Sequence, residues 1–369
     1  MKILEIERDT LLKPLQAVSG IVERRHTLPI LSNVLLETEG SELRLLATDL
    51  EIQVATSAAL DKPANAHSVT VSARKLQDIL RSLPEKAAVV FDQQESKLTL
   101  KAGKSRFNLQ TLPAQDFPRL SSGADGNITT VSLSQKQLKT TLQLVQYAMA
   151  QQDIRYYLNG LLLVIEKDRL IMVATDGHRL AYAESKLDQS YAKTELIVPR
   201  KAIMELVKLL ADSEELIELQ LQQNQIRFRF GDVDLVSKVV EGKFPDYTRV
   251  IPSGYKKHFP ISRVGLLQSL QRAAILSNEK FRGVRWVLAG NSLRIVCTNA
   301  EQEEAEEELE VQYEAEALDI GFNITYLLDV LNNLSVEEVD CAVGDPNSSM
   351  LITVPGDKNF KYVVMPMRI

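Results

Sequence analysis

The sequence predicts an α+β protein of three tandem homologous domains, each with antiparallel sheets covered on one face by two helices. One ordered set of landmarks recurs three times along the 369 residues, and each set holds two patterns with helical spacing. Between the helical patterns, apolar and polar residues alternate as they do in half-buried strands. The length allows two to four domains, and the repeat predicts domains at 1–127, 128–254 and 255–369.

A strand end followed by an amphipathic helix opens each repeat. The corresponding apolar residues lie 127 and then 128 positions apart. The three sets are Ile6, Leu11, Leu15 and Val18; Leu133, Leu138, Leu142 and Val145; and Ile261, Leu266, Leu270 and Ala273. Asp9, Ser134 and Ser262 stand near the helix starts and are expected to cap them. Pro14 predicts a kink or a late start in the first helix.

A tripeptide and a second helix complete the repeat. Ala-Thr-Asp at 47–49 recurs at 174–176 and becomes Cys-Thr-Asn at 297–299, each time after β-rich text. The second helical pattern comprises Val71, Leu76, Ile79, Leu80 and Leu83; Val198, Ile203, Leu206, Val207 and Leu210; and Phe322, Leu327, Val330, Leu331 and Leu334. The segments VVFDQQESKLTL and FRFGDVDLV are typical of hairpins.

The charge is distributed unevenly along the chain. The net charge of -6 argues against a uniformly basic surface that would coat nucleic acid. Residues 301–319 carry nine Glu, one Asp and no Lys or Arg, so the rest of the chain has a net charge of +4. Two interpretations of the acidic run are open: it forms a solvated loop, or it pairs with a basic strand that holds Lys101, Lys104 and Arg106. Head-to-tail closure of a tandem array would join the two and pair exposed strand edges.

Several classes of protein are excluded by what the sequence lacks. Two Cys give no disulfide framework, no apolar run is long enough for a membrane span, and the N-terminus has charge where a signal peptide is apolar. We therefore expect a soluble cytoplasmic protein. No catalytic motif is present, the four His match no metal-ligand spacing, and Gly103-Lys104-Ser105 has Leu98 where a phosphate loop needs Gly. We expect no enzyme, no metal and no cofactor.

Particular segments carry a resemblance that covers the whole chain. They include LLKPLQ at 11–16, RFNLQTLPAQDFP at 106–118, QQDIRYYLNG at 151–160 and VATDGHRLA at 173–181. They continue with RAAILSNEKFRGVR at 272–285, NAEQEEAEE at 299–307 and YVVMPMRI at 362–369. In order and spacing the chain resembles the bacterial β sliding clamps, the processivity subunits of replicative DNA polymerase III. The resemblance implies the DNA clamp fold: three domains form half of a six-domain, head-to-tail homodimeric ring around duplex DNA.

The resemblance and the basic helix faces together suggest how duplex DNA is held without sequence specificity. Phosphate contacts carry no sequence information, and aromatic rings stack on exposed bases. The expected DNA-binding residues are Arg25, Arg74, Gln152, Arg155, Tyr156, Tyr157, Arg200 and Lys201.

The resemblance also implies a dimer contact between unlike ends of two chains. Phe107 and Leu109 on one strand face meet two apolar residues of a second copy, and basic side chains face the acidic run. The expected interface residues are Lys75, Lys104, Arg106, Phe107, Leu109, Ile275, Leu276, Glu301, Glu303, Glu304, Glu306 and Glu307.

A peptide pocket is implied around the apolar C-terminal tail. Met-rich surfaces adapt to several ligands. The pocket would receive short extended peptides with a Gln and apolar anchors, from the polymerase α subunit, clamp-loader subunits, other polymerases and repair proteins. The expected residues are Leu158, Thr175, Gly177, His178, Arg179, Leu180, Pro245, Arg249, Val250, Phe281, Asn323, Tyr326, Ser349, Val363, Val364, Met365, Pro366, Met367 and Arg368. Ile369 stands where Leu is common in the family, and we expect a small effect on pocket shape.

Two other readings come from different classes of protein. The first is an enzyme whose cleft surrounds Asp176 and His178, although no nucleophile accompanies them. The second is a sequence-specific DNA binder, which needs a compact basic reading helix, and none stands out.

Overall fold

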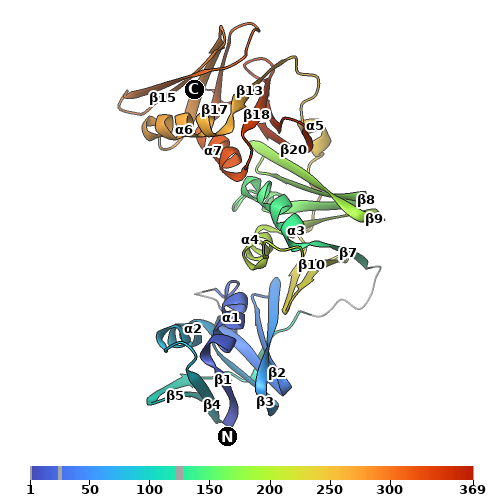
Figure 1. Ribbon diagram of the computed structural model, residues 1–369, viewed down its shortest axis with the longest axis vertical. Coiled ribbons are helices and arrows are strands. Elements are labelled where there is room, and N and C mark those ends of the chain that lie inside the picture. The colour runs from blue at the N-terminus through green and yellow to red at the C-terminus, as the bar shows by residue number, and fades with distance from the viewer. Residues whose placement is uncertain (1, 24–26, 121–127, 369) are drawn as a thin grey trace. The chain divides into compact units, whose positions relative to one another are not determined.

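The computed structural model describes residues 2–23, 27–120 and 128–368 (Figure 1). Contacts divide the chain into two compact units, residues 1–136 with 204–239 and residues 137–203 with 240–369. Each unit contains one four-stranded and one six-stranded sheet, and every described strand pair is antiparallel. Antiparallel sheets with helices packed on them confirm the predicted α+β class.

The first unit holds sheets A and B. Sheet A has the order β1-β4-β5-β6, with β1 Lys2–Glu7, β4 Ala88–Gln94, β5 Lys97–Ala102 and β6 Ser105–Gln110. Sheet B has the order β2-β3-β12-β11-β10-β7, with β2 Asn33–Thr48, β3 Ile52–Ser72, β12 Val233–Lys238, β11 Gln225–Phe230, β10 Leu216–Leu221 and β7 Thr129–Ser134. Both predicted hairpins form, as β4–β5 and β11–β12.

The second unit holds sheets C and D. Sheet C has the order β13-β18-β19-β20-β9-β8, with β13 Lys257–Ser262, β18 Glu338–Val343, β19 Met350–Val354, β20 Asp357–Val364, β9 Arg179–Pro199 and β8 Gly160–Thr175. Sheet D has the order β16-β15-β14-β17, with β16 Glu304–Glu310, β15 Ser292–Thr298, β14 Gly283–Ala289 and β17 Leu318–Asn323.

Sheets B and C each combine strands from two of the predicted repeats. In sheet B, β3 pairs with β12, and Val54 lies opposite Leu235. In sheet C, β9 pairs with β20, and Ala181 lies opposite Tyr362. Within the described residues, β6 of sheet A and β16 of sheet D hold the corresponding positions but have no strand on their outer side.

Helices recur in the same order as the strands. The α-helices are α1 Arg8–Ser19, α2 Ala73–Ser82, α3 Gln135–Gln143, α4 Arg200–Leu209, α5 Tyr247–Val250, α6 Arg263–Ala273 and α7 Ile324–Asn333. Short 3-10 turns are η1 Pro29–Ser32, η2 Ala114–Asp116, η3 Gln146–Ala148, η4 Tyr156–Leu158 and η5 Ala274–Leu276. α1 packs against α2, and α6 packs against α7.

The helix faces follow the predicted spacing, whereas one predicted cap is wrong. Leu11, Leu138 and Leu266 are buried, as their positions in the repeat predict. The Ser262 hydroxyl accepts a hydrogen bond from the Gly265 amide, 3.2 Å away, and caps α6. Asp9 lies inside the first turn of α1, which begins at Arg8 and continues through Pro14. Its carboxylate instead accepts a hydrogen bond from the Lys86 amide.

Candidate functional site

The turn between β8 and β9 is built by the Thr-Asp pair of the repeated tripeptide. The Thr175 hydroxyl donates to the Arg179 carbonyl (2.6 Å) and accepts from the Gly177 amide (3.0 Å). The Asp176 carboxylate accepts from the His178 amide at 2.9 Å. Gly177 has φ of 90°, which costs little without a Cβ. The Asp176 carboxylate therefore holds the turn, which accounts for its presence without acid–base chemistry.

Repeat one forms the same turn with the same bonds. The Thr48 hydroxyl donates to the Ile52 carbonyl at 2.8 Å, and the Asp49 carboxylate accepts from the Glu51 amide at 2.9 Å. Leu50, with φ of 78°, stands where repeat two has Gly177. The turn is thus a shared structural device, and what differs between repeats is the side chains around it.

Arg179, one of the predicted pocket residues, has a largely buried side chain. Its side chain is 9% exposed. The guanidinium donates to Asp176 (3.1 Å), to Asp329 of α7 (2.5 Å) and to the Tyr147 carbonyl (2.7 Å). It also lies over the Tyr326 ring, 4.4 Å from the centroid. These contacts attach the turn to α7, so Arg179 fixes the position of the turn that carries the predicted pocket residues Gly177 and His178.

The groups around Arg179 have strongly perturbed acid–base equilibria. Burial alone would lower the pKa of Arg179, but Tyr362, Asp329 and Asp176 outweigh burial and raise it. Burial raises the pKa of Tyr362, whose hydroxyl donates to the Tyr326 carbonyl at 2.9 Å. Both groups therefore keep one protonation state across the physiological range.

The C-terminal tail lies against the same turn. The Met365 amide donates to the His178 carbonyl at 2.9 Å, and the Met367 amide donates to the Gly321 carbonyl at 2.8 Å. Met365 is 45% exposed, whereas the preceding Val363 and Val364 are buried. The tail thus presents methionine side chains above an apolar floor.

A hydrophobic cluster forms that floor and gathers several of the predicted pocket residues. Leu180 and Val363 belong to it, and Tyr157, Tyr247 and Ile251 pack against it. The predicted residues Pro245, Arg249 and Val250 lie on the 244–251 segment that packs there, and Arg249 and Val250 are exposed. Two other predicted pocket residues, Leu158 and Thr175, are buried and do not form part of the exposed surface.

Phe281 and Asn323 lie near the end of the tail. Gly283 pairs with Asn323, and the Ile324 amide donates to the Arg282 carbonyl, which puts the two segments side by side. Phe281 is 59% exposed. Pro366 is half-buried and Arg368 exposed. Ser349 adjoins the start of the tail, because the next residue, Met350, pairs with Val364, and its carbonyl accepts the Tyr255 hydroxyl at 2.8 Å.

The predicted DNA-binding residues divide between exposed and engaged side chains. Tyr156 is 62% exposed, and Gln152 and Arg74 are also exposed. Tyr157 packs against the hydrophobic cluster. The Arg200 guanidinium is half-buried and donates to the Met149 carbonyl at 2.9 Å, and burial lowers its pKa. Lys201 is half-buried, and the predicted Arg25 lies outside the described residues.

The predicted interface residues lie along β6, β16 and their flanks. Leu109 is buried and Phe107 half-buried on β6, whereas Ile275 is 78% exposed and Leu276 half-buried. A pocket of about 190 Å³ opens beside Leu109 and is also lined by Pro29, Asn33, Ser72, Lys75, Gln110, Thr111 and Leu112. One side of the predicted interface thus has an exposed apolar residue, Ile275, and the other side has a pocket of side-chain size beside Leu109.

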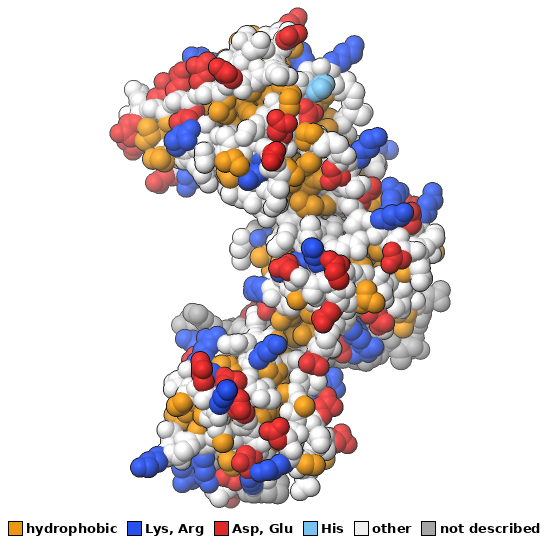
Figure 2. All heavy atoms as spheres, viewed as in Figure 1, with side chains coloured by type: hydrophobic (Ala, Val, Ile, Leu, Met, Phe, Trp, Pro, Cys, Tyr) orange, Lys and Arg blue, Asp and Glu red, His pale blue; other side chains and the backbone are white. Residues whose placement is uncertain are grey.

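Charges on the two edges are opposite in sign. On the face shown in Figure 2, acidic side chains gather over sheet D and basic ones over sheet A. Lys75, Lys104 and Arg106 are exposed and form no ion pair within the described residues. Glu301, Glu303, Glu304 and Glu306 are exposed. Glu306 lies 3.6 Å from Arg294, and the half-buried Glu307 pairs with Arg272 at 2.5 Å. The hydrogen bond from Arg272 lowers the pKa of Glu307.

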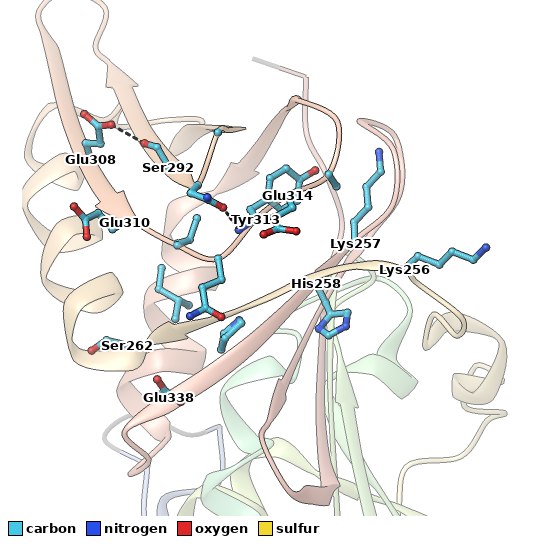
Figure 3. Close-up of a pocket in the computed structure, with 17 residues that line it drawn as sticks. Lys256, Lys257, His258, Ser262, Ser292, Glu308, Glu310, Tyr313, Glu314 and Glu338 are labelled. Atoms are coloured by element: carbon cyan, nitrogen blue, oxygen red, sulfur yellow. Dashed lines mark hydrogen bonds between the residues drawn. The ribbon is translucent and has the colours of Figure 1, made fainter.

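A polar pocket of about 1200 Å³ adjoins the same acidic edge (Figure 3). Lys256 and Lys257 line one side of it, and Glu308 and Glu310 of β16 line the other. The Ser292 hydroxyl donates to Glu308 at 2.6 Å. No sequence pattern pointed to this pocket, because its walls come from strands and loops far apart in the chain.

Among the described residues, no helix is long and apolar enough to cross a membrane. In the same ranges, no group of three or more His, Cys, Asp or Glu is arranged to hold a metal ion.

Repeated clamp-like units, two open sheet edges and a tail-lined surface define a protein of the DNA clamp class. Three family descriptions match: "DNA polymerase III beta subunit, N-terminal domain" over 1–121, "central domain" over 132–246 and "C-terminal domain" over 248–368. The chain belongs to this family, the β sliding clamps of DNA polymerase III.

Relatives and solved structures agree with that assignment. The chain is 48% identical to the beta sliding clamp of Pseudomonas putida over 365 residues and 45% identical to that of Escherichia coli over 364, covering 99% of each protein. The crystal structure of the DNA polymerase III subunit beta from Pseudomonas aeruginosa matches with a TM-score of 0.94 at 46% identity, covering 100% of both chains.

Removing the acid that faces Arg179 tests the buried ion pair. Asp329→Asn leaves the guanidinium buried with one charged partner fewer, so we expect a loss of about 2 kcal/mol of stability. Urea unfolding followed by fluorescence of Trp286, the single tryptophan and in the same unit, measures it. Asp319→Asn is the control, because Asp319 lies in the same unit as Trp286 and pairs with Arg285 at the exposed surface, and it should change stability by less than about 0.5 kcal/mol. Equal effects of the two substitutions would contradict the role of Arg179.

Proposed function

We propose that two copies of this clamp close head to tail into a ring around duplex DNA and tether polymerases and repair proteins through the pocket at the C-terminal tail. The observation that carries the proposal is the pair of open edges, β6 and β16. They are the strands whose counterparts pair in sheets B and C. The proposed domains, each one-sixth of the ring, keep the boundaries 1–127, 128–254 and 255–369.

The existing junctions specify the register of the proposed one. At the junction in sheet B, Leu235 pairs with Val54. On its own side Leu235 also pairs with Phe228, and Val54 also pairs with Ala47, the residue before the repeated Thr. Phe107 is the counterpart of Leu235, because it pairs with Leu100 on its own side. Ala305 is the counterpart of Val54, because it pairs with Cys297, the residue before Thr298. Phe107 of one copy therefore lies opposite Ala305 of the next.

Extending this register aligns opposite charges. Arg106 falls opposite Glu306, and Lys104, at the tip of the β5–β6 hairpin, falls opposite Glu308. Glu308 also lines the pocket of Figure 3, so the hairpin tip is directed toward that pocket's acidic wall.

Apolar side chains support the same junction. Ile275 holds the place in its repeat that Tyr147 holds in repeat two. At the junction within sheet C, the Tyr147 ring lies 5.9 Å from that of Tyr362, the counterpart of Phe107. Ile275 is therefore expected beside Phe107, near the small pocket at Leu109.

The ring would hold DNA by closure rather than by tight contacts. Exposed basic residues such as Arg74, with Gln152 and Tyr156, would supply weak attraction that salt screens. Nothing in this mechanism needs catalysis, and we infer that the protein is not an enzyme. Loading by an ATP-driven loader in the cytoplasm fits this role.

The tail-lined surface fits a short extended peptide with apolar anchors. Val250 and Met365 are exposed apolar groups. Val250 precedes Ile251, which packs on the cluster, and Met365 follows the cluster residue Val363 by two positions. One of the similar solved structures is described as a Pseudomonas aeruginosa sliding clamp bound to griselimycin. We propose that partner peptides of the polymerase, the clamp loader and repair proteins bind here.

A charge swap tests the register of the ring junction. Arg106→Glu should weaken the dimer about 30-fold, because about 1 kcal/mol is lost at each of two equivalent junctions. Glu306→Arg should do the same, and the double variant should recover most of the loss in sedimentation at serial dilution. Arg44→Glu, an exposed basic site on β2, is the control. Failure of the double variant to recover would refute the register, and an unchanged dimer in an Ile275→Ala, Leu276→Lys variant would refute the interface.

Topological retention tests encirclement. Clamp placed on nicked circular plasmid by a clamp loader with ATP should stay bound through gel filtration and leave when a restriction enzyme linearises the plasmid. Affinity for a short linear duplex should be weak and fall with salt, because only screened phosphate contacts hold it. Retention on linear plasmid would rule the ring out.

Deleting residues 365–369 tests the pocket. The deletion removes the amide bonds to His178 and Gly321 together with both methionines, so binding of a labelled partner peptide should be lost. The dimer should persist in sedimentation, because the tail follows β20 and bonds His178 and Gly321, neither of which lies on β6 or β16. Undiminished peptide binding would remove the tail from the proposed site.

A further inference from the structure

The loop from Ala150 to Asn159 has two faces held by one rigid frame. The Ala150 amide donates to the Leu158 carbonyl at 3.0 Å. The Asp153 amide donates to the Asn159 side chain (2.9 Å), whose own amide group donates back to the Asp153 carbonyl (2.8 Å). These bonds leave the loop little freedom to rearrange one face without the other.

Side chains of this loop point in two directions. Gln152, Ile154 and Tyr156 are exposed, Ile154 to 94%. Tyr157 packs on the pocket's cluster, and Leu158 is buried. The outward face carries predicted DNA contacts, and the inward face is part of the proposed peptide pocket.

Arg155 connects this frame to the turn of the pocket. Its Nε and Nη2 donate to the two Asp153 carboxylate oxygens at 3.0 and 2.9 Å, and Nη2 also donates to the Asp176 carbonyl at 3.3 Å. A Cβ on Gly177 would lie 2.9 Å from Nη2 and 3.1 Å from Nη1. The guanidinium thus fills the place of a Gly177 side chain, one residue before His178, whose carbonyl holds the tail.

We propose that Arg155 is a positioning residue of the peptide pocket and links peptide affinity to DNA at the loop. The proposal rests on the proposed function of the pocket. Arg155 holds the turn of residues 175–179 in the form that the Met365 amide requires. Among the described residues its Nη1 has no acceptor. A DNA phosphate at Nη1 would add to the existing bonds and restrict the guanidinium over Gly177.

Coupling of this kind is reciprocal, so DNA on the outward face raises peptide affinity and peptide raises DNA affinity. Asp153, the acidic partner of Arg155, is ionised in this arrangement. Hydrogen bonds from Arg155 lower the pKa of Asp153 to about 2, so the carboxylate stays ionised throughout the physiological range. Asp153 therefore orients Arg155 whether or not DNA is present.

Peptide titration of the full-length dimer tests the positioning role. The probe is a fluorescein-labelled decapeptide with one Gln and two large apolar residues, followed by fluorescence anisotropy. Arg155→Ala should weaken binding about tenfold, because a charged hydrogen-bonded group that holds the turn is lost. Arg155→Lys should recover part of it, since a point charge reaches Asp153 without bridging to Asp176. Arg169→Ala removes an arginine of β8 that pairs with Glu184 and does not contact the turn at 175–179, so this variant should bind as the unmodified protein does.

The coupling is measured by repeating the titration with saturating 30-base-pair duplex carrying a single-stranded overhang, at matched ionic strength. DNA should tighten peptide binding about threefold in the unmodified protein and not at all in Arg155→Ala. An Arg155→Ala variant that binds peptide normally, or an equal loss in Arg169→Ala, overturns the positioning role. Equal DNA dependence in both proteins overturns the coupling. Absence of peptide binding in the unmodified protein would instead refute the proposed pocket.

Discussion

Backbone pairing at strand edges is the constraint on which the rest of this structure depends. An edge strand exposes N–H and C=O groups that have to find partners in water or in another strand. The chain meets this need twice, where β3 pairs with β12 and β9 pairs with β20. Each pairing joins strands of successive repeats into one sheet, so these repeats are not structurally independent domains. The same constraint makes β6 and β16 the natural place for an assembly contact.

The repeated turn shows how one backbone device carries different functions. Thr48 and Thr175 close the turn with the same hydroxyl bonds, and Asp49 and Asp176 with the same carboxylate bonds. Where repeat one continues with Ile52, repeat two has Arg179, which reaches α7 through Asp329. The turn itself is therefore not the site; the site arises where its side chains join the tail and α7.

The sequence predicts the helix faces and the repeat well because spacing alone decides which side of a helix or strand is buried. Leu15 and Leu270 are buried, and Ser262 caps its helix, for that local reason. The environment of polar side chains depends instead on residues far away in the chain. Arg179 finds Asp329 across 150 positions, and Asp9 bonds the Lys86 amide instead of capping α1.

Exposure of single aromatic residues shares that dependence. Tyr156 and Tyr157 are adjacent and chemically identical, and the resemblance assigns both to DNA. The loop frame turns Tyr156 outward and packs Tyr157 on the cluster of Leu180 and Val363. The signal that separates them is the closure of the loop by Asp153 and Asn159, which is a tertiary contact rather than a spacing in the sequence.

The three junctions of the proposed ring have different chemistry, and this difference bears on why the chain closes rather than polymerises. At the first junction the space beside Gly20 is filled by the buried carboxylate of Glu205, and a Cβ there would lie 1.5 Å from its Oε1. At the second, a basic turn residue, Arg179, meets an acidic helix residue, Asp329. At the third, the turn residue is acidic, because Glu303 replaces the arginine.

Glu303 occupies the position of Arg179 in repeat three, since its amide bonds the Asn299 side chain as that of Arg179 bonds Asp176. On the proposed partner helix α2, Lys75 stands where α7 has Tyr326. Asp78 stands where α7 has Asp329, but it is exposed and lies beside Arg74 of its own helix. The helix residue that differs is therefore Lys75, which gives the acidic turn a basic neighbour at ring closure that α7 does not offer. Complementary charges favour one pairing over others, and a contact that returns to the start of the chain closes a ring instead of extending a filament.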